Sequence, residues 1–169
     1  MNFLINKGQG PNHGIVFSML NDLGADHRLI IAKAPENFLE GVTDDRYNIM
    51  DIDTKKLGVA VFSIDAYAGD QTSIQQLSEL STKLLTERTL GDYTVPKDVI
   101  LIVMADEETF PELFDEKQIE EKFSAKLLDF TCGHPEKIRE ILEPELKTLL
   151  NLKSPAPSRK RVEDDSPSP

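Results

Sequence analysis

Residues 98–106 read DVILIVMAD, and this stretch decides the fold class of the chain. Its apolar run, Val99 to Met104, is rich in β-branched residues and stands between two aspartates. A half-exposed strand would alternate apolar and polar side chains, so a short run that is apolar throughout indicates a strand covered on both faces. A short buried helix is the alternative, but the length and the β-branching of the run favour a strand. The sequence therefore predicts the central strand of a parallel or mixed sheet with helices on both sides.

The rest of the chain supplies neighbours for this strand. Apolar runs bounded by turn residues predict further strands at residues 3–5, 28–33, 47–52 and 57–64. Apolar residues at helical spacing predict helices that include residues 15–23, 74–85, 119–128 and 138–149. Four polar residues separate 47–52 from 57–64, which indicates an antiparallel hairpin. We therefore expect one α/β domain over residues 1–152, with a mixed, partly parallel sheet of about five strands flanked by helices.

Residues 153–169 differ from this domain in composition. They are rich in proline and serine and lack apolar periodicity, which predicts a disordered tail. The tail contains the basic run Arg159-Lys160-Arg161, together with serines that precede prolines. A basic run of this kind is typical of nuclear import signals, and Ser-Pro pairs are typical sites of proline-directed kinases. The tail therefore indicates a protein that works among eukaryotic partners, with nuclear entry or delivery into a host cell as an effector as the two alternatives.

The charge of the chain restricts its partners. The net charge is -11, and the segment after Leu150 holds four basic and three acidic residues, so the acidic excess lies in the domain. An acidic domain repels nucleic-acid phosphates and anionic lipid headgroups, so we expect neither nucleic acid nor a membrane as a partner. We expect a protein partner with a basic surface; the alternative is that the charge only maintains solubility. Cys132 is the single cysteine, which fits a reducing, cytoplasmic location.

A glycine-rich segment follows the first predicted strand. Gly8, Gly10 and Gly14 spell G-x-G-x-x-x-G before a predicted helix, where backbone amides can approach a phosphate. Asn12 and His13 in the same segment can bind a ligand or move protons. No acid ends the next strand and no Lys-Ser or Lys-Thr pair follows the glycines, so neither a dinucleotide fingerprint nor a P-loop is complete. The segment is a candidate phosphate site; a plain turn is the alternative.

Acidic residues follow two of the predicted strands. Asp65 and Asp70 come after residues 57–64, and Asp106 comes directly after the central strand. If the strands are parallel, their carboxyl ends meet at one edge of the sheet, where open α/β sheets bind ligands. Carboxylate oxygens are the ligands that Mg²⁺ prefers, so these residues form a candidate magnesium site. The alternative is that they cap the helices that follow.

Two other sequence motifs bear on catalytic function. Asp51 and Asp53 form a D-x-D pair, but the residues around it do not fit phosphoaspartyl-transfer enzymes. Cys132 and His134 lie close together in the sequence, which makes a cysteine hydrolase a further hypothesis. A structural role for the cysteine is the alternative.

These observations lead to one preferred function and two alternatives. We expect a non-enzymatic, acidic, cytoplasmic protein-interaction or regulatory domain, because no complete catalytic or cofactor motif is found. The first alternative is a nucleotide-binding or phosphate-binding enzyme, Mg²⁺-dependent, with its site at the carboxyl ends of the strands. The second alternative is a cysteine hydrolase that uses Cys132.

Overall fold

A five-stranded parallel sheet forms the centre of the protein. The computed structural model describes residues 2–8, 12–46, 48–66, 69–129 and 136–153. The strand order is β2-β3-β6-β1-β7, and every pairing between neighbours is parallel. The strands are β1 (Asn2–Asn6), β2 (Asp26–Ala32), β3 (Gly58–Ile64), β6 (Ile100–Ala105) and β7 (Ala125–Asp129). The predicted α/β class and the predicted number of strands are confirmed.

β6, the strand predicted from residues 98–106, occupies the middle of the sheet. It lies between β3 and β1, and all of its residues are buried. Side chains alternate between the two faces of a strand, so an apolar residue at every position matches a strand covered on both sides. The prediction of a central buried strand is confirmed.

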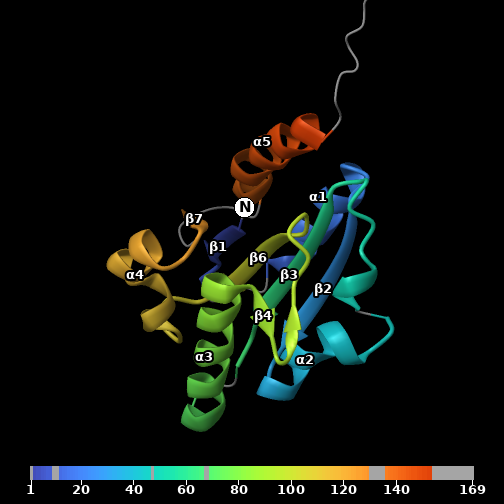
Figure 1. Cartoon of the computed structure of the whole chain (residues 1–169). Coiled ribbons are helices and arrows are strands. Elements are labelled where there is room, and N and C mark those ends of the chain that lie inside the picture. Colours follow the sequence, from blue (N-terminus) through green and yellow to red (C-terminus); the bar gives the residue numbers. More distant parts are fainter. Residues whose placement is uncertain (1, 9–11, 47, 67–68, 130–135, 154–169) are drawn as a thin grey trace, which may run out of the picture.

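Helices form a layer on each face of the sheet. α1 (His13–Asp22) and α5 (Glu136–Lys153) pack on one face with Phe3 and Ile5 of β1. Leu4 of β1 lies on the other face, which four helical elements cover. These are α2 (Pro35–Thr43), α3 (Gln71–Glu87), η2 (Pro111–Phe114) and α4 (Glu116–Glu121) (Figure 1).

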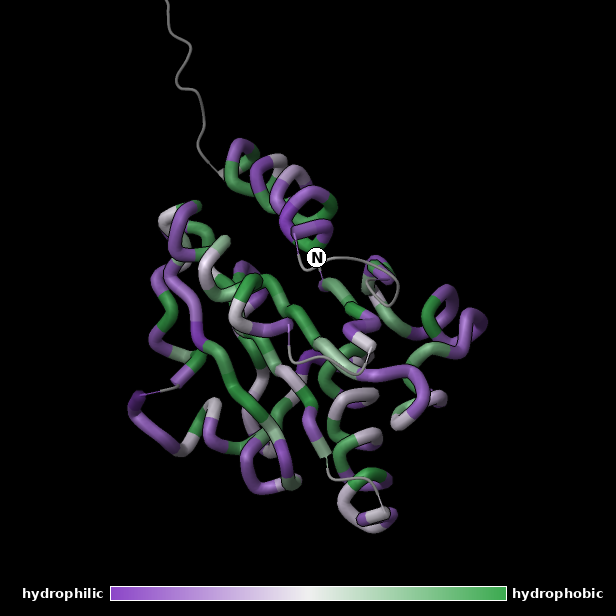
Figure 2. The backbone as a smooth tube through the Cα atoms, turned by 180° about the vertical axis from the view of Figure 1, so that it is seen from behind, coloured by the Kyte–Doolittle hydropathy of each residue, from purple (hydrophilic) through white to green (hydrophobic). Residues whose placement is uncertain are grey.

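The hydropathy of the chain follows this layered arrangement. The backbone is mainly hydrophobic through the sheet, whereas hydrophilic and hydrophobic residues alternate along α5 (Figure 2). In the layer between the sheet and α2, the rings of Phe38 and Phe62 stack with their centroids 5.0 Å apart. Both side chains are fully buried, so this pair anchors α2 to β3.

The predicted antiparallel hairpin over residues 47–64 is wrong. Ile49–Asp51 form a short 3-10 helix, η1, because the side chain of Asn48 accepts a hydrogen bond from the backbone of Met50 at 2.9 Å and closes a turn. β3 then pairs on one side with β2 and on the other with β6, so neither edge of β3 is available for a hairpin partner. The antiparallel pairing that the structure shows lies elsewhere, between β4 (Thr89–Leu90) and β5 (Tyr93–Thr94).

The predicted helix that includes residues 119–128 is also corrected. α4 ends at Glu121, and β7 then pairs with β1 at the edge of the sheet. Leu127 and Leu128 had the spacing of a helical stripe with Ile119, but in β7 they point to opposite sides: Leu128 is buried and Leu127 is 40% exposed. A short edge strand with one apolar face gives only a weak alternating pattern in the sequence. The sequence analysis therefore extended the helix over these residues.

Two further points concern the predicted tail and the length and polarity of the helices. The predicted tail lies, from residue 154 onward, outside the described residues. Within the described part of the chain, every helix is either too short or too polar to cross a lipid bilayer.

Candidate functional site

The topology of the sheet marks one position at its carboxyl edge. From β1 the chain passes to α1 on one face, whereas from the neighbouring strand β6 it passes to η2 and α4 on the opposite face. The two connections therefore diverge and leave a crevice between the ends of β1 and β6. Open α/β sheets bind their ligands at such a switch point. The segments after β1, β3 and β6 meet at this edge, as the sequence predicted for parallel strands.

Lys7 lies at this switch point. Its backbone continues β1, with its N–H donating to the carbonyl of Ala105 at 2.9 Å. Its side chain is only 3% exposed and reaches past the end of β6 to β3. There the Nζ donates to Ser63 Oγ at 3.2 Å and forms an ion pair with Asp65. A buried ammonium is tolerated when it is paired and hydrogen-bonded in this way.

The hydrogen-bond network extends from Ser63 to the start of α1. Ser63 is fully buried, and its Oγ lies 3.3 Å from Nδ1 of His13, the first residue of α1. The neighbouring Asn12 has a left-handed backbone (φ 46) and donates from Nδ2 to the carbonyl of Lys7 at 3.0 Å. Both ends of the glycine-rich segment are therefore tied to the network around Lys7.

A second contact joins the segments after β1 and β6. The side chain of Asn6 donates from Nδ2 to Glu107 Oε1 at 3.0 Å and accepts from the backbone N–H of Glu107 at 3.2 Å. Asn6 is buried, so this paired contact ties the turn after β6 to the end of β1.

The predicted magnesium ligands have different neighbours. Asp65 is the ion-pair partner of Lys7. Asp106 accepts from the backbone of Glu108 and from Thr109 Oγ1, both at 3.2 Å, and so closes the turn after β6. Asp70 is the N-cap of α3, where it accepts from the backbone N–H of Ser73 at 3.2 Å. Among the described residues, no three His, Cys, Asp or Glu side chains gather closely enough to hold a metal ion.

Two adjoining cavities open at the crevice. A cavity of about 200 Å³ lies at the strand ends, and its lining includes Lys7, Gly8, Asp65 and Asp106. A larger groove of about 530 Å³ lies between the first half of α3 and residues 108–112. Thr109 and Phe110 line both of them, so the two cavities are neighbours across these side chains.

The other predicted site residues are placed as follows. Gly8 lines the smaller cavity with a positive φ of 66, a conformation that favours glycine. Gly14 lies within α1, and a Cβ built there meets nothing within 4 Å. Gly10, Cys132 and His134 lie outside the described residues, so the cysteine-hydrolase hypothesis stays a prediction.

Sequence reasoning missed Lys7, Ser63 and Asn6. The signal for Lys7 was a cation directly after the apolar run Phe3-Leu4-Ile5, where a residue that continues a central strand is buried. Ser63 had the corresponding signal, a lone hydroxyl in the otherwise apolar segment at residues 57–64.

Comparison of the chain with protein-family models, with curated proteins and with solved structures found no match.

Proposed function

We propose that the strand-end crevice binds a small phosphate-bearing ligand of the nucleotide class together with Mg²⁺. The observation that carries this proposal is Lys7, a lysine that is 3% exposed and lies at the switch point of the sheet. Burial of an ion pair seldom stabilises a fold more than apolar residues of the same size would. A buried lysine at the edge where open sheets bind ligands is therefore better explained by ligand recognition than by packing.

The charges around the smaller cavity indicate why a metal ion is needed. The ammonium of Lys7 is offset by Asp65, and Asp106 adds a further negative charge to the lining. A phosphate alone would be repelled there. Mg²⁺ characteristically uses one or two protein carboxylates, several waters and the phosphate oxygens of the ligand. Such an ion would bridge a carboxylate and the phosphate without requiring three protein ligands.

The sizes of the two cavities support an elongated ligand. Pockets for small molecules are typically about 300–1,000 Å³, so the cavity of about 200 Å³ suits only the phosphate end. The adjoining groove of about 530 Å³ offers the amides of Gln71 and Gln75 beside the apolar Ile74 and Phe110. Amide side chains provide both donors and acceptors, as a sugar or a base requires. We propose binding without turnover, because Ser63, the hydroxyl in the network around Lys7, is fully buried.

Thermal melting of the full chain tests this proposal. ATP and pyrophosphate are each added with and without Mg²⁺. A ligand at 100 times its dissociation constant stabilises a fold by about 2.7 kcal/mol, which corresponds to a shift of several degrees at about 2–4 °C per kcal/mol. We expect a shift only when the phosphate compound and Mg²⁺ are both present. No shift with either compound would refute the proposal.

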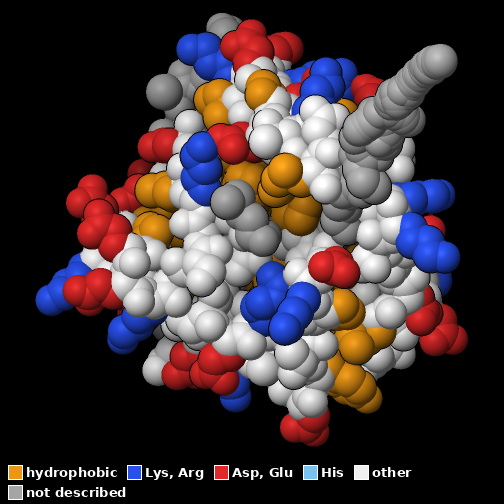
Figure 3. Space-filling model, turned by 45° about the horizontal axis from the view of Figure 1, so that its top comes forward, with side chains coloured by type: hydrophobic (Ala, Val, Ile, Leu, Met, Phe, Trp, Pro, Cys, Tyr) orange, Lys and Arg blue, Asp and Glu red, His pale blue; other side chains and the backbone are white. Residues whose placement is uncertain are grey.

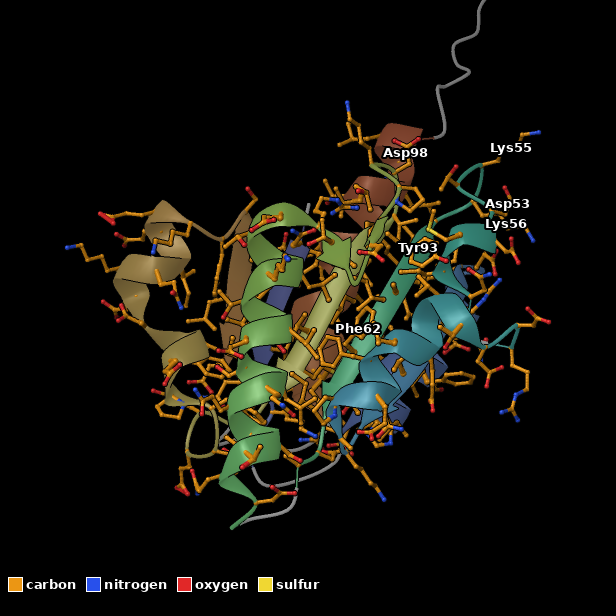
Figure 4. The ribbon with its side chains drawn as sticks, turned by 60° about the horizontal axis from the view of Figure 1, so that its bottom comes forward. Asp53, Lys55, Lys56, Phe62, Tyr93 and Asp98 are labelled. Carbon is orange, nitrogen blue, oxygen red and sulfur yellow. The ribbon has the colours of Figure 1, made fainter. Side chains whose placement is uncertain are left out.

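A pair of aspartate variants locates the effect. Asp106→Asn keeps a side-chain acceptor for the turn after β6 but removes the charge, and we expect it to abolish the Mg²⁺-dependent shift. Asp98→Asn is the matched control because Asp98 lies beyond the opposite end of the same strand (Figure 4). An equal loss in both variants would show that the effect does not arise at the crevice.

A second candidate function is the binding of a basic protein segment in the larger groove. Glu108 and Glu112 line this groove beside the apolar Ile74, Phe110 and Pro111, a combination that suits a lysine-rich or arginine-rich peptide. On the face seen in Figure 3, by contrast, acidic and basic side chains are mixed, so this face presents no large patch of a single charge. This candidate agrees with the acidic protein-interaction domain that the composition predicts.

Peptide binding separates this second candidate from the first. A fluorescent peptide rich in lysine and arginine should bind with an affinity that falls as salt rises. The double change Glu108→Gln and Glu112→Gln should weaken it, whereas Glu79→Gln, on α3 outside the groove lining, should not. Equal binding by the double variant and the wild type would reject the groove as a peptide site.

A further inference from the structure

The hydrogen bonds around Ser63 decide which nitrogen of His13 carries the proton. Lys7 Nζ lies 3.2 Å from Ser63 Oγ, and an ammonium group only donates, so Ser63 accepts this bond. Ser63 Oγ also lies 3.3 Å from His13 Nδ1. A serine hydroxyl has a single proton, and that proton must find an acceptor because Ser63 is fully buried.

His13 Nδ1 is the acceptor that the described residues offer to this proton. Ser63 has no other side-chain hydrogen bond among them than those to Lys7 and His13. If Nδ1 carried a proton, Nδ1 would donate to Ser63 as Lys7 does, and the hydroxyl proton of Ser63 would stay buried without an acceptor. A buried polar group without a partner is costly, so this arrangement is disfavoured. Nδ1 is therefore unprotonated, and the proton of neutral His13 lies on Nε2.

We infer that Lys7 and Ser63 hold His13 as the Nε2–H tautomer and thereby make it a hydrogen-bond donor of the crevice. This inference rests on the proposed function for the identity of the acceptor, an anionic phosphate oxygen. His13 begins α1 near the end of the glycine-rich segment and is partly exposed, and its hydrogen-bond network includes Lys7, which lines the smaller cavity. His13 is then a specificity residue that selects an anionic acceptor. Toward a ligand at Nε2 it is a donor and not a base, because Nε2 already carries a proton and the basic Nδ1 faces Ser63.

Nuclear magnetic resonance of the full chain, labelled with ¹⁵N at histidine, tests the tautomer without any ligand. At pH 8 we expect His13 to show an unprotonated Nδ1 and a protonated Nε2. His13→Gln identifies the resonances. In Ser63→Ala the His13 signals should move to the average of two tautomers. His27 should stay unchanged, because its Nε2 has a separate partner, Asn21 Oδ1, at 3.0 Å. A protonated Nδ1, or averaged tautomers in the wild type, would overturn the inference.

Two His13 variants test the donor role, with pyrophosphate and Mg²⁺ as the probe. The glutamine amide in His13→Gln reaches the position of Nε2, whereas the asparagine amide in His13→Asn reaches only that of Nδ1. We expect His13→Asn to bind about tenfold more weakly than the wild type, as for the loss of one hydrogen bond to a charged acceptor, and His13→Gln to bind nearly as well. Equal affinity in all three proteins would overturn the donor role.

The two experiments also separate this inference from the proposed function. If the wild type does not bind pyrophosphate with Mg²⁺ but His13 is held as the Nε2–H tautomer, the proposed function and the ligand role of His13 fall while the tautomer assignment stands. If the wild type binds and the tautomers average, the proposed function stands and the inference falls.

Discussion

Lys7, at the end of β1, forms an ion pair with Asp65, at the end of β3, although β6 separates these two strands in the sheet. The lysine side chain spans the end of the central strand and is 3% exposed, whereas the aspartate side chain is 26% exposed. The pair therefore joins three neighbouring strands at the edge where the chain reverses its winding direction. Both residues also line the smaller cavity of the candidate site.

The first prediction concerns the energy of this pair. Lys7→Met should lower the free energy of unfolding by about 3–5 kcal/mol, because it leaves the carboxylate of Asp65 partly buried without its cation. Asp65→Asn should have a similar cost, and the double variant should recover part of the loss. Lys126→Met, in the exposed pair with Glu145, is the control and should cost about 1 kcal/mol or less. Urea denaturation measures all four variants, and equal losses for the two lysine variants would contradict the assignment.

The second prediction compares two glycines of the same segment. Gly8 has a φ of 66, so Gly8→Ala should destabilise the protein by about 1–2 kcal/mol. Gly14 lies in α1 with open space around its Cα, so Gly14→Ala should stabilise the protein by about 0.5–1 kcal/mol. Thermal denaturation measures both changes. Destabilisation by the alanine at position 14 but not at position 8 would contradict the backbone described for this segment.

The third prediction concerns the packing of α2 on the sheet. Phe62 points from β3 toward α2 and stacks on Phe38, with both rings fully buried (Figure 4). Phe62→Ala should therefore cost about 3–5 kcal/mol. Tyr93→Ala is the control, because Tyr93 is 49% exposed and its loss should have little effect. A small effect of Phe62→Ala in urea denaturation would show that this layer is not packed as described.

The fourth prediction concerns the pH dependence of stability through His27. Burial lowers the pKa of His27, an effect that Asp26 opposes and Arg28 supports. The unfolded chain therefore binds a proton at a higher pH than the folded chain does, so stability rises with pH in the window just below the ordinary pKa of about 6.5. Acidification through that window should destabilise the wild type, and His27→Gln should reduce this dependence. Identical slopes in the wild type and the variant, measured by urea denaturation between pH 7.5 and 5.5, would contradict the burial effect.

The sequence predicted the fold well where a local pattern had a single interpretation. The apolar run from Val99 to Met104 is explained by a central parallel strand, and β1, α1 and β2 follow as one strand-helix-strand unit. The prediction failed where different secondary-structure elements have similar sequence patterns. Leu127 and Leu128 continued a helical stripe but belong to an edge strand, and the predicted strand at residues 47–52 contains a turn closed by Asn48.

The candidate site could be predicted only in part. Parallel pairing places the ends of β1, β3 and β6 at one edge, so the positions of Gly8, Asp65 and Asp106 followed from the predicted topology. The contacts that Ser63 makes with Lys7 and His13 could not be predicted, because these residues are 56 and 50 positions away in the sequence. Such contacts depend on the order of strands in the sheet, which local patterns do not determine.

The most direct test of the central claim is calorimetric titration of the full chain with ATP, in the presence and in the absence of Mg²⁺. Saturable binding of one ATP in the presence of Mg²⁺, competed by pyrophosphate, lost in Asp106→Asn and retained in Asp98→Asn, is the result that we predict. Absence of binding under both conditions, or binding of equal strength in the wild type and in Asp106→Asn, would contradict the assignment of the crevice as a site for a phosphate ligand with Mg²⁺.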